Sequence, residues 1–347
     1  MNAKNEKYSK YALCREMLDT VDVVRKFDPS RTAAVAAAIK ANGRLMLTGE
    51  GSSRIFPAKN FIRKVLTAGL NLQVVTEGSR QAMTYDLSRF AVFAASNSGR
   101  TKEVVKLLKQ LRDGGNKELF GLTAQPENLL KEYARETIVL NCGWETAVAA
   151  TKSVIEQALT YQSMLGHMTG SNACTCDCKN RLADAIEQAL TIEIPADIVA
   201  AAAKAPTIYF AGYNDGVAEE LTLKTNEITR KKSDFLEGTY ACHGIEEVMS
   251  PADIVFVVDP IAEEMDKFRE VLVDGVGLKV VCIATSPIAG FPTIVVPESG
   301  EGTPHVFLAA GWNILVEIGL ALGINLDKPQ RKADFHQNIP DRKSTRL

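Results

Sequence analysis

The chain has 347 residues, of which 46% are apolar, so it is long enough to bury the cores of about two domains. Its 40 Lys and Arg against 42 Asp and Glu give a formal charge of −2, which excludes the strong positive field that attracts nucleic acid or an acidic membrane. The polar first ten residues lack the apolar core of a signal peptide, and an odd number of cysteines, seven, suits a reducing compartment. We therefore expect a cytoplasmic globular protein with no nucleic-acid or membrane partner.

Alternating apolar segments and turns predict the helices and strands of the first half of the chain. Two helices are expected over 6–26 and 30–41, and a strand over 45–48 then enters the Gly/Ser turn Gly49–Arg54. This turn is not the dinucleotide fingerprint, because its third glycine is absent and no ribose-binding acid follows a strand at the expected place. A helix over about 55–68 follows, then strands over 72–75, 91–95, 119–122 and 137–140, with helices between them. This alternation predicts a doubly wound parallel sheet.

The segment that follows the strand at 91–95 indicates an anion site. Ser96, Ser98 and Thr101 supply three hydroxyl donors, and Gly99 lets a ligand approach the backbone. Thr101 lies at or near the start of an apolar-periodic helix, where the first N–H groups are free and the dipole is positive. An ordinary capped helix after a strand would show a similar pattern, so both interpretations stay open.

Parallel sheets bind ligands beyond the carboxyl ends of their strands. Ser52 and Ser53, which follow the first strand, should therefore converge with the Ser96 loop on one crevice. Farther along, the segment Glu145–Lys152 leads into a long helix that ends at about 168. We interpret Lys152 as a solvated residue of that helix, and a functional role for it also stays open.

The cysteines Cys174, Cys176 and Cys178 form a local cluster that could supply three metal ligands. No second ligand cluster lies nearby at zinc-site spacing, so we interpret these residues as a polar loop or helix start and expect no metal and no cofactor. The longest apolar segment, 305–324, is interrupted by Asn313 and Glu317. It is predicted to be a core helix rather than a membrane span.

An internal repeat divides the chain into two copies of one α/β unit. Strand ends in the two halves lie 163 positions apart, as at Gly49 and Gly212 or at Ala94 and Val257. We predict the α/β class with two tandem doubly wound parallel-sheet domains of the flavodoxin type. Their strands pair as 45–48 with 208–211, 91–95 with 254–258 and 119–123 with 282–286. The expected organisation is N-terminal helices over 1–43, a first domain over 44–168, a bridging segment over 169–190, a second domain over 191–326 and a tail over 327–347.

The second copy lacks the hydroxyl donors of the first. At the positions 163 residues after Ser96, Ser98 and Thr101 stand Asp259, Ile261 and Glu264. Carboxylates there would repel a phosphate, so the second copy must contribute something else to a site.

Two segments of the second copy carry side chains suited to proton transfer. Lys224 and Glu227 are three residues apart on a helix predicted over 219–229 and project from the same face. His243 follows a short strand at 233–235 and lies in a loop. A carboxylate and an imidazole can shuttle protons between the carbons and oxygens of a sugar. On composition alone, however, Lys224 and Glu227 are an exposed ion pair, and this interpretation also stays open.

Taken together, the Ser96 loop, the duplication and the segments of Glu227 and His243 resemble the sugar isomerase (SIS) domain superfamily over about 40–330. The resemblance is strongest to the isomerase half of glutamine–fructose-6-phosphate transaminase and to the fructosamine-phosphate deglycases. The phosphate loop of the family is matched by Ser96, Asn97, Ser98, Gly99 and Thr101, and its Gly-Thr-Ser turn by Gly51, Ser52 and Ser53. Its sugar-contacting Val-Ala-Ser-Thr-Lys segment is matched by Val148–Lys152, with Ala150 in place of the serine.

The resemblance implies roles for residues of both copies. Glu227 would be the base that moves the proton between C1 and C2, Lys224 its partner in the Lys-x-x-Glu helix, and His243 the acid that opens the sugar ring. In the family this histidine comes from the other subunit, so the resemblance implies a homodimer with a shared phosphosugar site. Lys332 loosely matches a lysine that covers the sugar.

The chain also departs from the family. Nothing in it resembles the glutaminase half, so we expect no glutaminase domain. The glutamate that supports the histidine loop in the family is missing from Tyr240–Ile245. The expected function is a phosphosugar isomerase or deglycase acting on a 6-phosphorylated ketose or fructosamine phosphate. The alternatives are a non-catalytic phosphosugar sensor, although no DNA-binding domain is visible, and a structural subunit in which the loop is an empty turn.

Overall fold

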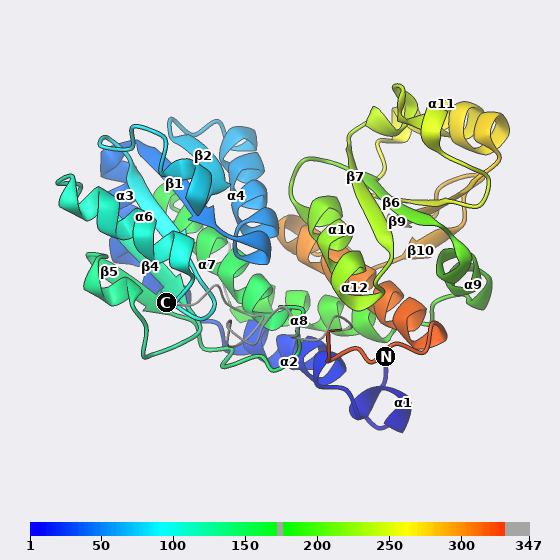
Figure 1. Ribbon diagram of the computed structural model, residues 1–347, viewed down its shortest axis with the longest axis horizontal. Helices are drawn as coiled ribbons and strands as arrows, with labels where there is room; N and C mark the ends of the chain where they lie inside the picture. The colour runs from blue at the N-terminus through cyan, green and yellow to red at the C-terminus, as the bar shows by residue number, and fades with distance from the viewer. Residues whose placement is uncertain (172–175, 330–347) are drawn as a thin grey trace. The chain divides into compact units, whose positions relative to one another are not determined.

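The structure is a computed structural model that describes residues 1–171 and 176–329, and its chain forms two compact units (Figure 1). Unit 1 contains Met1–Val21, Thr146–Ala149 and Asn180–Pro329, and unit 2 contains the described residues of Asp22–Glu145 and Ala150–Lys179. Each unit holds one five-stranded parallel sheet with helices packed against it. The predicted α/β class with two parallel sheets is therefore confirmed.

The sheet of unit 2 has the strand order β2-β1-β3-β4-β5, and all of its strand pairs are parallel. All five residues of β3 are buried, as expected for a strand that is covered on both faces. The strands are β1 (Arg44–Gly49), β2 (Gln73–Gly78), β3 (Ala91–Ala95), β4 (Leu119–Thr123) and β5 (Glu136–Val139).

Two apolar clusters cover the two faces of this sheet, because successive side chains of a strand point to opposite sides. Phe93 packs in the cluster formed with α3 (Ala33–Asn42), α4 (Ile55–Thr67) and α7 (Lys152–Thr169). Its neighbours Val92 and Ala94 pack in the other cluster, formed with α5 (Ser79–Ala82) and α6 (Lys102–Asp113). The helices thus form a layer on each side of the sheet (Figure 1).

The sheet of unit 1 repeats this topology. Its order, β7-β6-β8-β9-β10, is that of unit 2 strand for strand, and it is the flavodoxin-like order 2-1-3-4-5. The duplication predicted from the sequence is therefore present in the fold. The strands are β6 (Thr207–Gly212), β7 (Lys232–Glu237), β8 (Ile254–Val258), β9 (Lys279–Ala284) and β10 (Thr293–Val295), and the helices are α1 (Glu6–Ser9), α9 (Ala196–Lys204), α10 (Val217–Ile228), α11 (Met265–Phe268) and α12 (Thr303–Ala321).

The offset of 163 residues does not extend to the fourth strand. It relates β1 to β6 and β3 to β8, as predicted. Val92 pairs with Leu119, whereas its counterpart Val255 pairs with Val280, so the offset falls to 161 here. The strand predicted at 282–286 is therefore β9 at Lys279–Ala284, because the connection from β8 is two residues shorter and contains a π-helical segment, Arg269–Val276.

The single helix predicted over 6–26 is wrong, because the helix breaks at residues 10 and 11. α1 ends at Ser9, and α2 (Ala12–Lys26) begins afresh. The backbone N–H groups of Ala12 and Leu13 each donate to the carboxylate of Asp327 at 2.9 Å. A carboxylate from the far end of unit 1 thus caps α2 at its positive end. The second predicted helix, 30–41, is a short 3-10 turn followed by α3.

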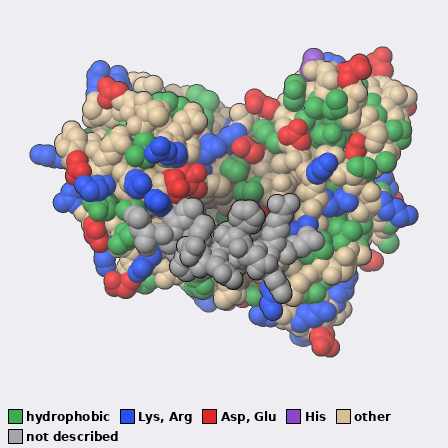
Figure 2. Space-filling model, viewed as in Figure 1, with side chains coloured by type: hydrophobic (Ala, Val, Ile, Leu, Met, Phe, Trp, Pro, Cys, Tyr) green, Lys and Arg blue, Asp and Glu red, His purple; other side chains and the backbone are tan. Residues whose placement is uncertain are grey.

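The segment Gly300–Ala321, which contains α12, is the one stretch of the described residues long and apolar enough to cross a membrane. About 78% of its most apolar window is buried, and α12 packs on α9 and α10. A single such helix is weak evidence for a membrane span, because the core helix of a soluble protein meets the same criteria. On the face drawn in Figure 2, acidic and basic side chains are interspersed.

Candidate functional site

The loop after β3 is closed by its own hydroxyl groups. Ser96 Oγ lies 2.8 Å from Thr101 Oγ1 and accepts the Thr101 N–H at 3.3 Å. Ser98 Oγ accepts the N–H of Arg100 at 3.2 Å, and both serines are buried. Thr101 immediately precedes α6, but its side chain makes no capping hydrogen bond to that helix. A capped helix therefore does not account for Thr101, whose hydroxyl is held in the loop instead.

Gly99 lets this loop pack against the turn after β4. Its φ of +65° is in the left-handed region, and its N–H donates to the Ser96 carbonyl at 2.8 Å. A Cβ at this position would lie inside van der Waals contact with Asn128 and 2.9 Å from Thr123 Oγ1. The close approach and the backbone angle both require glycine here.

Replacing Gly99 with alanine is expected to destabilise the protein by about 1–3 kcal/mol, because the left-handed backbone and the contact with Asn128 both oppose a Cβ. The matched control is Gly115→Ala, where φ is +89° but no heavy atom lies within 4 Å of the added Cβ. Urea unfolding of both variants measures the effect. A loss as large in Gly115→Ala would show that the contact with Asn128 adds nothing to the backbone strain.

The turn that carries Ser52 and Ser53 lies at the same edge of the sheet as the Ser96 loop. β1 and β3 are neighbours, and Thr48 at the end of β1 pairs with Ala94 at the end of β3. At Gly49 a Cβ would lie 2.9 Å from the Ala95 carbonyl oxygen, so the turn passes directly over the end of β3. Unit 2 thus brings the two predicted phosphate-binding segments together at the carboxyl edge of its sheet. Gly51 opens the turn with a φ of +56°.

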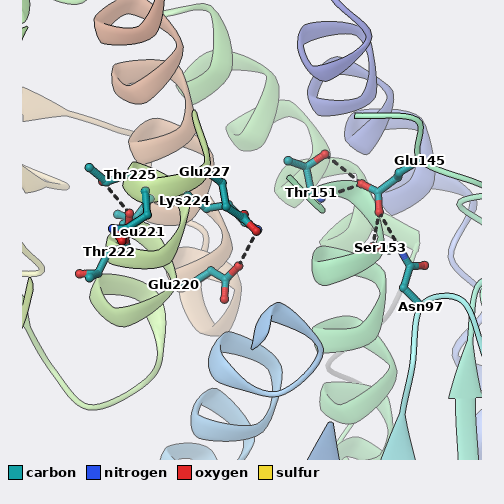
Figure 3. Close-up of polar contacts among 11 residues, drawn as sticks. Asn97, Glu145, Thr151, Ser153, Glu220, Leu221, Thr222, Lys224, Thr225 and Glu227 are labelled. Atoms are coloured by element: carbon teal, nitrogen blue, oxygen red, sulfur yellow. Dashed lines mark hydrogen bonds and ion pairs between the residues drawn. The ribbon is translucent and has the colours of Figure 1, made fainter. Parts of the chain in front are cut away.

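Glu145 lies fully buried between the Ser96 loop and the start of α7 (Figure 3). Its carboxylate accepts the Thr151 N–H at 2.6 Å and the Thr151 hydroxyl at 3.0 Å, and it also accepts the Ser153 hydroxyl. From the phosphate loop, Asn97 Nδ2 donates to the same carboxylate at 3.3 Å. Sequence reasoning assigned Glu145 no role. The available signal was an acid just ahead of a helix, where it can satisfy free N–H groups.

The residues just before the segment expected to contact the sugar are held by a carboxylate of unit 1. Glu16 of α2 is buried and accepts hydrogen bonds from the Thr146 hydroxyl at 2.9 Å and from the Ala147 N–H at 3.2 Å. Val148, of unit 1, and Ala150, of unit 2, are half-buried. Lys152 is buried, so the prediction that it is solvated is wrong, because nearly every residue of α7 is buried.

Lys224 is the centre of a buried charge cluster in α10 (Figure 3). Its ammonium lies 2.8 Å from Glu227 Oε2 and 3.2 Å from Glu220 Oε1, and the side chains of Lys224 and Glu220 are 0% exposed. Burial alone lowers the pKa of Lys224, but the charges of Glu227 and Glu220 outweigh it and raise that pKa above its ordinary value. The exposed-pair interpretation of Lys224 and Glu227 is therefore wrong. Glu220, four residues before Lys224, was missed although its spacing was visible.

Glu227 differs from Glu220 in its access to solvent. Its side chain is 28% exposed, whereas that of Glu220 has no exposed surface. Of the two carboxylates beside Lys224, only Glu227 can therefore reach a bound molecule.

His243 lies in an exposed loop, as predicted. Its Nε2 lies 3.1 Å from Lys267 Nζ. The N–H of Gly244 donates to Glu246 at 2.6 Å, so Glu246 supports the loop that lacks the family's glutamate. Among the described residues, no hydrogen bond or ion pair joins His243 to Glu227.

The prediction for Lys332 and part of the prediction for the cysteine cluster fall outside the described residues. Lys332 and Cys174 are outside them. Cys176 is the first residue of α8 (Cys176–Thr191), in agreement with the predicted helix start, and Cys178 lies in the first turn of that helix. Within 1–171 and 176–329, no three His, Cys, Asp or Glu side chains are grouped to hold a metal ion.

Residues 38–166 match the family model described as the SIS domain. The chain contains a SIS domain. The match covers the sheet of unit 2 together with α4, α6 and most of α7, and it includes the Ser96 loop and Glu145. The resemblance to this family predicted from the sequence is confirmed.

Full-length comparisons extend beyond the SIS domain of unit 2. The chain is 24% identical over 327 residues to the isomerizing glutamine–fructose-6-phosphate aminotransferase of Aeropyrum pernix, a match that covers 88% of this chain and 53% of that protein. The chain thus spans about half the length of this relative.

Two solved structures share the fold of the whole chain. The C-terminal domain of glucosamine-fructose-6-phosphate aminotransferase from Francisella tularensis has a TM-score of 0.76 at 15% identity and covers 94% of this chain and 100% of that one. Tagatose-6-phosphate ketose/aldose isomerase from Escherichia coli has a TM-score of 0.76 at 16% identity, and the match covers 94% of this chain and 99% of that one. At these identities the likeness shows that both units, and not only the SIS domain of unit 2, share the fold of these proteins.

Proposed function

We propose that this protein is a phosphosugar isomerase or deglycase that acts on a 6-phosphorylated ketose or on a fructosamine phosphate. The observation that carries the proposal is the Ser96–Thr101 loop of the SIS domain. The hydroxyls of Ser96 and Thr101 lie at the start of α6 and are bonded to each other, and Thr101 makes no capping hydrogen bond to the helix. Hydroxyls and free N–H groups at the positive end of a helix form an anion site. The names of the relatives above, which refer to sugar 6-phosphates, support the same class of ligand.

The phosphate would be held at the carboxyl edge of the unit 2 sheet. Donors from two adjacent strand ends surround this position, as the packing of the Gly49 turn on Ala95 indicates. The residues assigned to the phosphate are Ser52, Ser53, Ser96, Asn97, Ser98 and Thr101, and those assigned to the sugar are Gly51, Val148, Ala150 and Lys332.

Glu227 is the proposed base. Its partly exposed carboxylate takes a proton from C1 of the open-chain ketose to form an enediol and returns it to C2, while a hydroxyl proton passes from O1 to O2. The product is the aldose 6-phosphate. With a fructosamine phosphate, the same transfer gives an imine at C1, and water releases the amine and the aldose phosphate. No redox step is involved.

His243 is the proposed acid for ring opening, in which the proton of the anomeric hydroxyl is exchanged for one on the ring oxygen. It is exposed, no hydrogen bond or ion pair joins it to Glu227 among the described residues, and its loop carries Tyr240 and Val248, which are 50% and 71% exposed. An exposed histidine between exposed apolar side chains fits a loop that enters the site of a second copy. We therefore propose a homodimer, located in the cytoplasm, with a site shared between subunits.

The test is release of glucose 6-phosphate, measured by a coupled assay, from a panel of fructose 6-phosphate amine adducts, with fructose 6-phosphate as the isomerase substrate. Release from one adduct identifies a deglycase and its amine, whereas conversion of fructose 6-phosphate alone identifies an isomerase. Binding without turnover of any compound would make the protein a phosphosugar sensor and overturn the enzyme assignment.

The phosphate site has its own test in the double variant Ser98→Ala/Thr101→Ala. Loss of two hydrogen bonds to a charged group, at about 1.5–3 kcal/mol each, is expected to weaken fructose 6-phosphate binding by about 100-fold or more. Titration calorimetry measures the affinity. The control is Thr67→Ala on α4, whose hydroxyl donates only to the Arg63 carbonyl. Unchanged affinity in the double variant would place the phosphate elsewhere.

A further inference from the structure

We propose that Glu145 is a positioning residue that holds the Asn97 side chain, and with it the phosphate loop, in the form that binds phosphosugar. The inference rests on the proposed function. It concerns a residue of unit 2 for which the sequence suggested no role, and it is carried by three features of the Glu145 contacts.

The first feature is that the Glu145 carboxylate has a fixed orientation. One oxygen accepts the N–H and the hydroxyl of Thr151, and the other accepts the Ser153 hydroxyl and Asn97 Nδ2 (Figure 3). A carboxylate has about four acceptor sites, and these four donors hold both of its oxygens. The side chain is fully buried, and water does not compete for these sites. Asn97 therefore donates to a group that cannot turn away.

The second feature is that Glu145 determines which way the Asn97 amide faces. A carboxylate only accepts, so the amide must present its nitrogen to Glu145. Among residues 1–171 and 176–329, Asn97 Oδ1 is buried and has no hydrogen-bond partner. The amide keeps this orientation although its oxygen makes no hydrogen bond there among the described residues. The hydrogen bond from Nδ2 to Glu145 therefore determines the orientation of the amide.

The third feature is the position of Asn97 within the loop. Its backbone carbonyl accepts the Ala124 N–H at 3.0 Å and the Thr123 hydroxyl at 3.2 Å, which ties the loop to the end of β4. Its side chain ties the loop to Glu145, and hence to the start of α7. Asn97 lies between Ser96 and Ser98, so both proposed phosphate-binding serines are neighbours of a residue fixed on two sides.

The test is a double-mutant cycle with Glu145→Gln and Asn97→Ala in the full chain, read out by the dissociation constant of fructose 6-phosphate. Glu145→Gln is expected to raise this constant about tenfold or more, because the glutamine can donate to Asn97 and let the amide turn. The double variant is expected to bind no more weakly than Asn97→Ala alone, because Glu145 acts through Asn97. In the enzyme assay, Glu145→Gln should raise KM and leave kcat within about threefold.

Ser153→Ala is the matched control, since it removes another hydrogen bond of Glu145 but none to the phosphate loop. It is expected to lower the thermal unfolding midpoint while leaving the dissociation constant within about twofold. Equal weakening of binding by Ser153→Ala and Glu145→Gln, or additive effects in the cycle, would overturn the proposal and leave Glu145 a structural residue.

Two further outcomes are separated by design. If Glu145→Gln does not fold, Glu145→Asp replaces it in the cycle, because it keeps the charge and shortens the reach to Asn97. If the wild-type protein binds neither fructose 6-phosphate nor inorganic phosphate, the proposed function fails and this inference fails with it. If the wild type binds and only the cycle is additive, the inference alone is wrong.

Discussion

Glu227→Gln is expected to lower turnover of the active phosphosugar by about 10²–10⁴-fold, the usual contribution of a positioned general base. The amide cannot take the proton from C1, although it keeps the shape of the side chain and a hydrogen-bonding atom beside Lys224. Binding of fructose 6-phosphate is expected to change little, because the loop of unit 2 supplies the phosphate contacts in the proposed site. The measurements are kcat in the coupled assay and exchange of the C1 and C2 hydrogens with deuterated water.

The matched control for this variant is Glu220→Gln on the same helix. Glu220 also faces Lys224, at 3.2 Å, but it has no exposed surface with which to reach a substrate. The Glu220→Gln variant is expected to be less stable than the wild type and to retain most of its turnover. Normal turnover in Glu227→Gln would reject the assigned base, and equal losses in both variants would indicate that the cluster acts only by holding α10 in place.

Lys224→Met is expected to destabilise the protein by about 3–5 kcal/mol, because removing one partner of a buried ion pair is strongly destabilising. Glu220, whose side chain is 0% exposed, would lose its ion pair with Lys224. Urea unfolding measures the change. The control is Lys109→Met, whose ion pair with Asp113 at 2.6 Å is exposed and is expected to contribute little. A similar, small effect of both variants would show that burial does not strengthen the Lys224 contacts.

The same cluster predicts a dependence of stability on alkaline pH. The pKa of Lys224 is raised above its ordinary value of 10.5, so the folded state holds this proton more tightly than the unfolded chain does. Its contribution to stability is fully present below about pH 10.5 and is lost as the pH rises through the folded-state pKa. The difference in unfolding free energy between wild type and Lys224→Met should therefore shrink above that pH. A constant difference up to pH 12 would contradict a raised pKa.

Local patterns in the sequence were sufficient to predict the α/β class of this fold and its internal duplication. The apolar segment Ala91–Ala95 is a buried central strand, and the hydroxyl-rich loop that follows it occupies the start of α6. These features depend on neighbouring residues, because strand burial, a glycine with positive φ and a free helix end are all properties of short segments. The offset of 163 was applied to three strand pairs and located β6 and β8 correctly. It failed at β9, where pairing with β8 rather than chain length sets the strand position.

Tertiary structure alone decided the electrostatics of the candidate site. A lysine and a glutamate three residues apart look the same in a sequence whether exposed or buried, and only the packing of α10 against α12, β6 and β7 buries Lys224. Glu145 and Glu16 accept hydrogen bonds from residues far away in the sequence, Asn97 and Ala147 respectively. Asp327 likewise caps α2 near the other end of the chain. The sequence by itself determined which segments form strands, helices and the anion loop. Which charges are buried, and what holds them there, depends on distant segments that meet only in the folded chain.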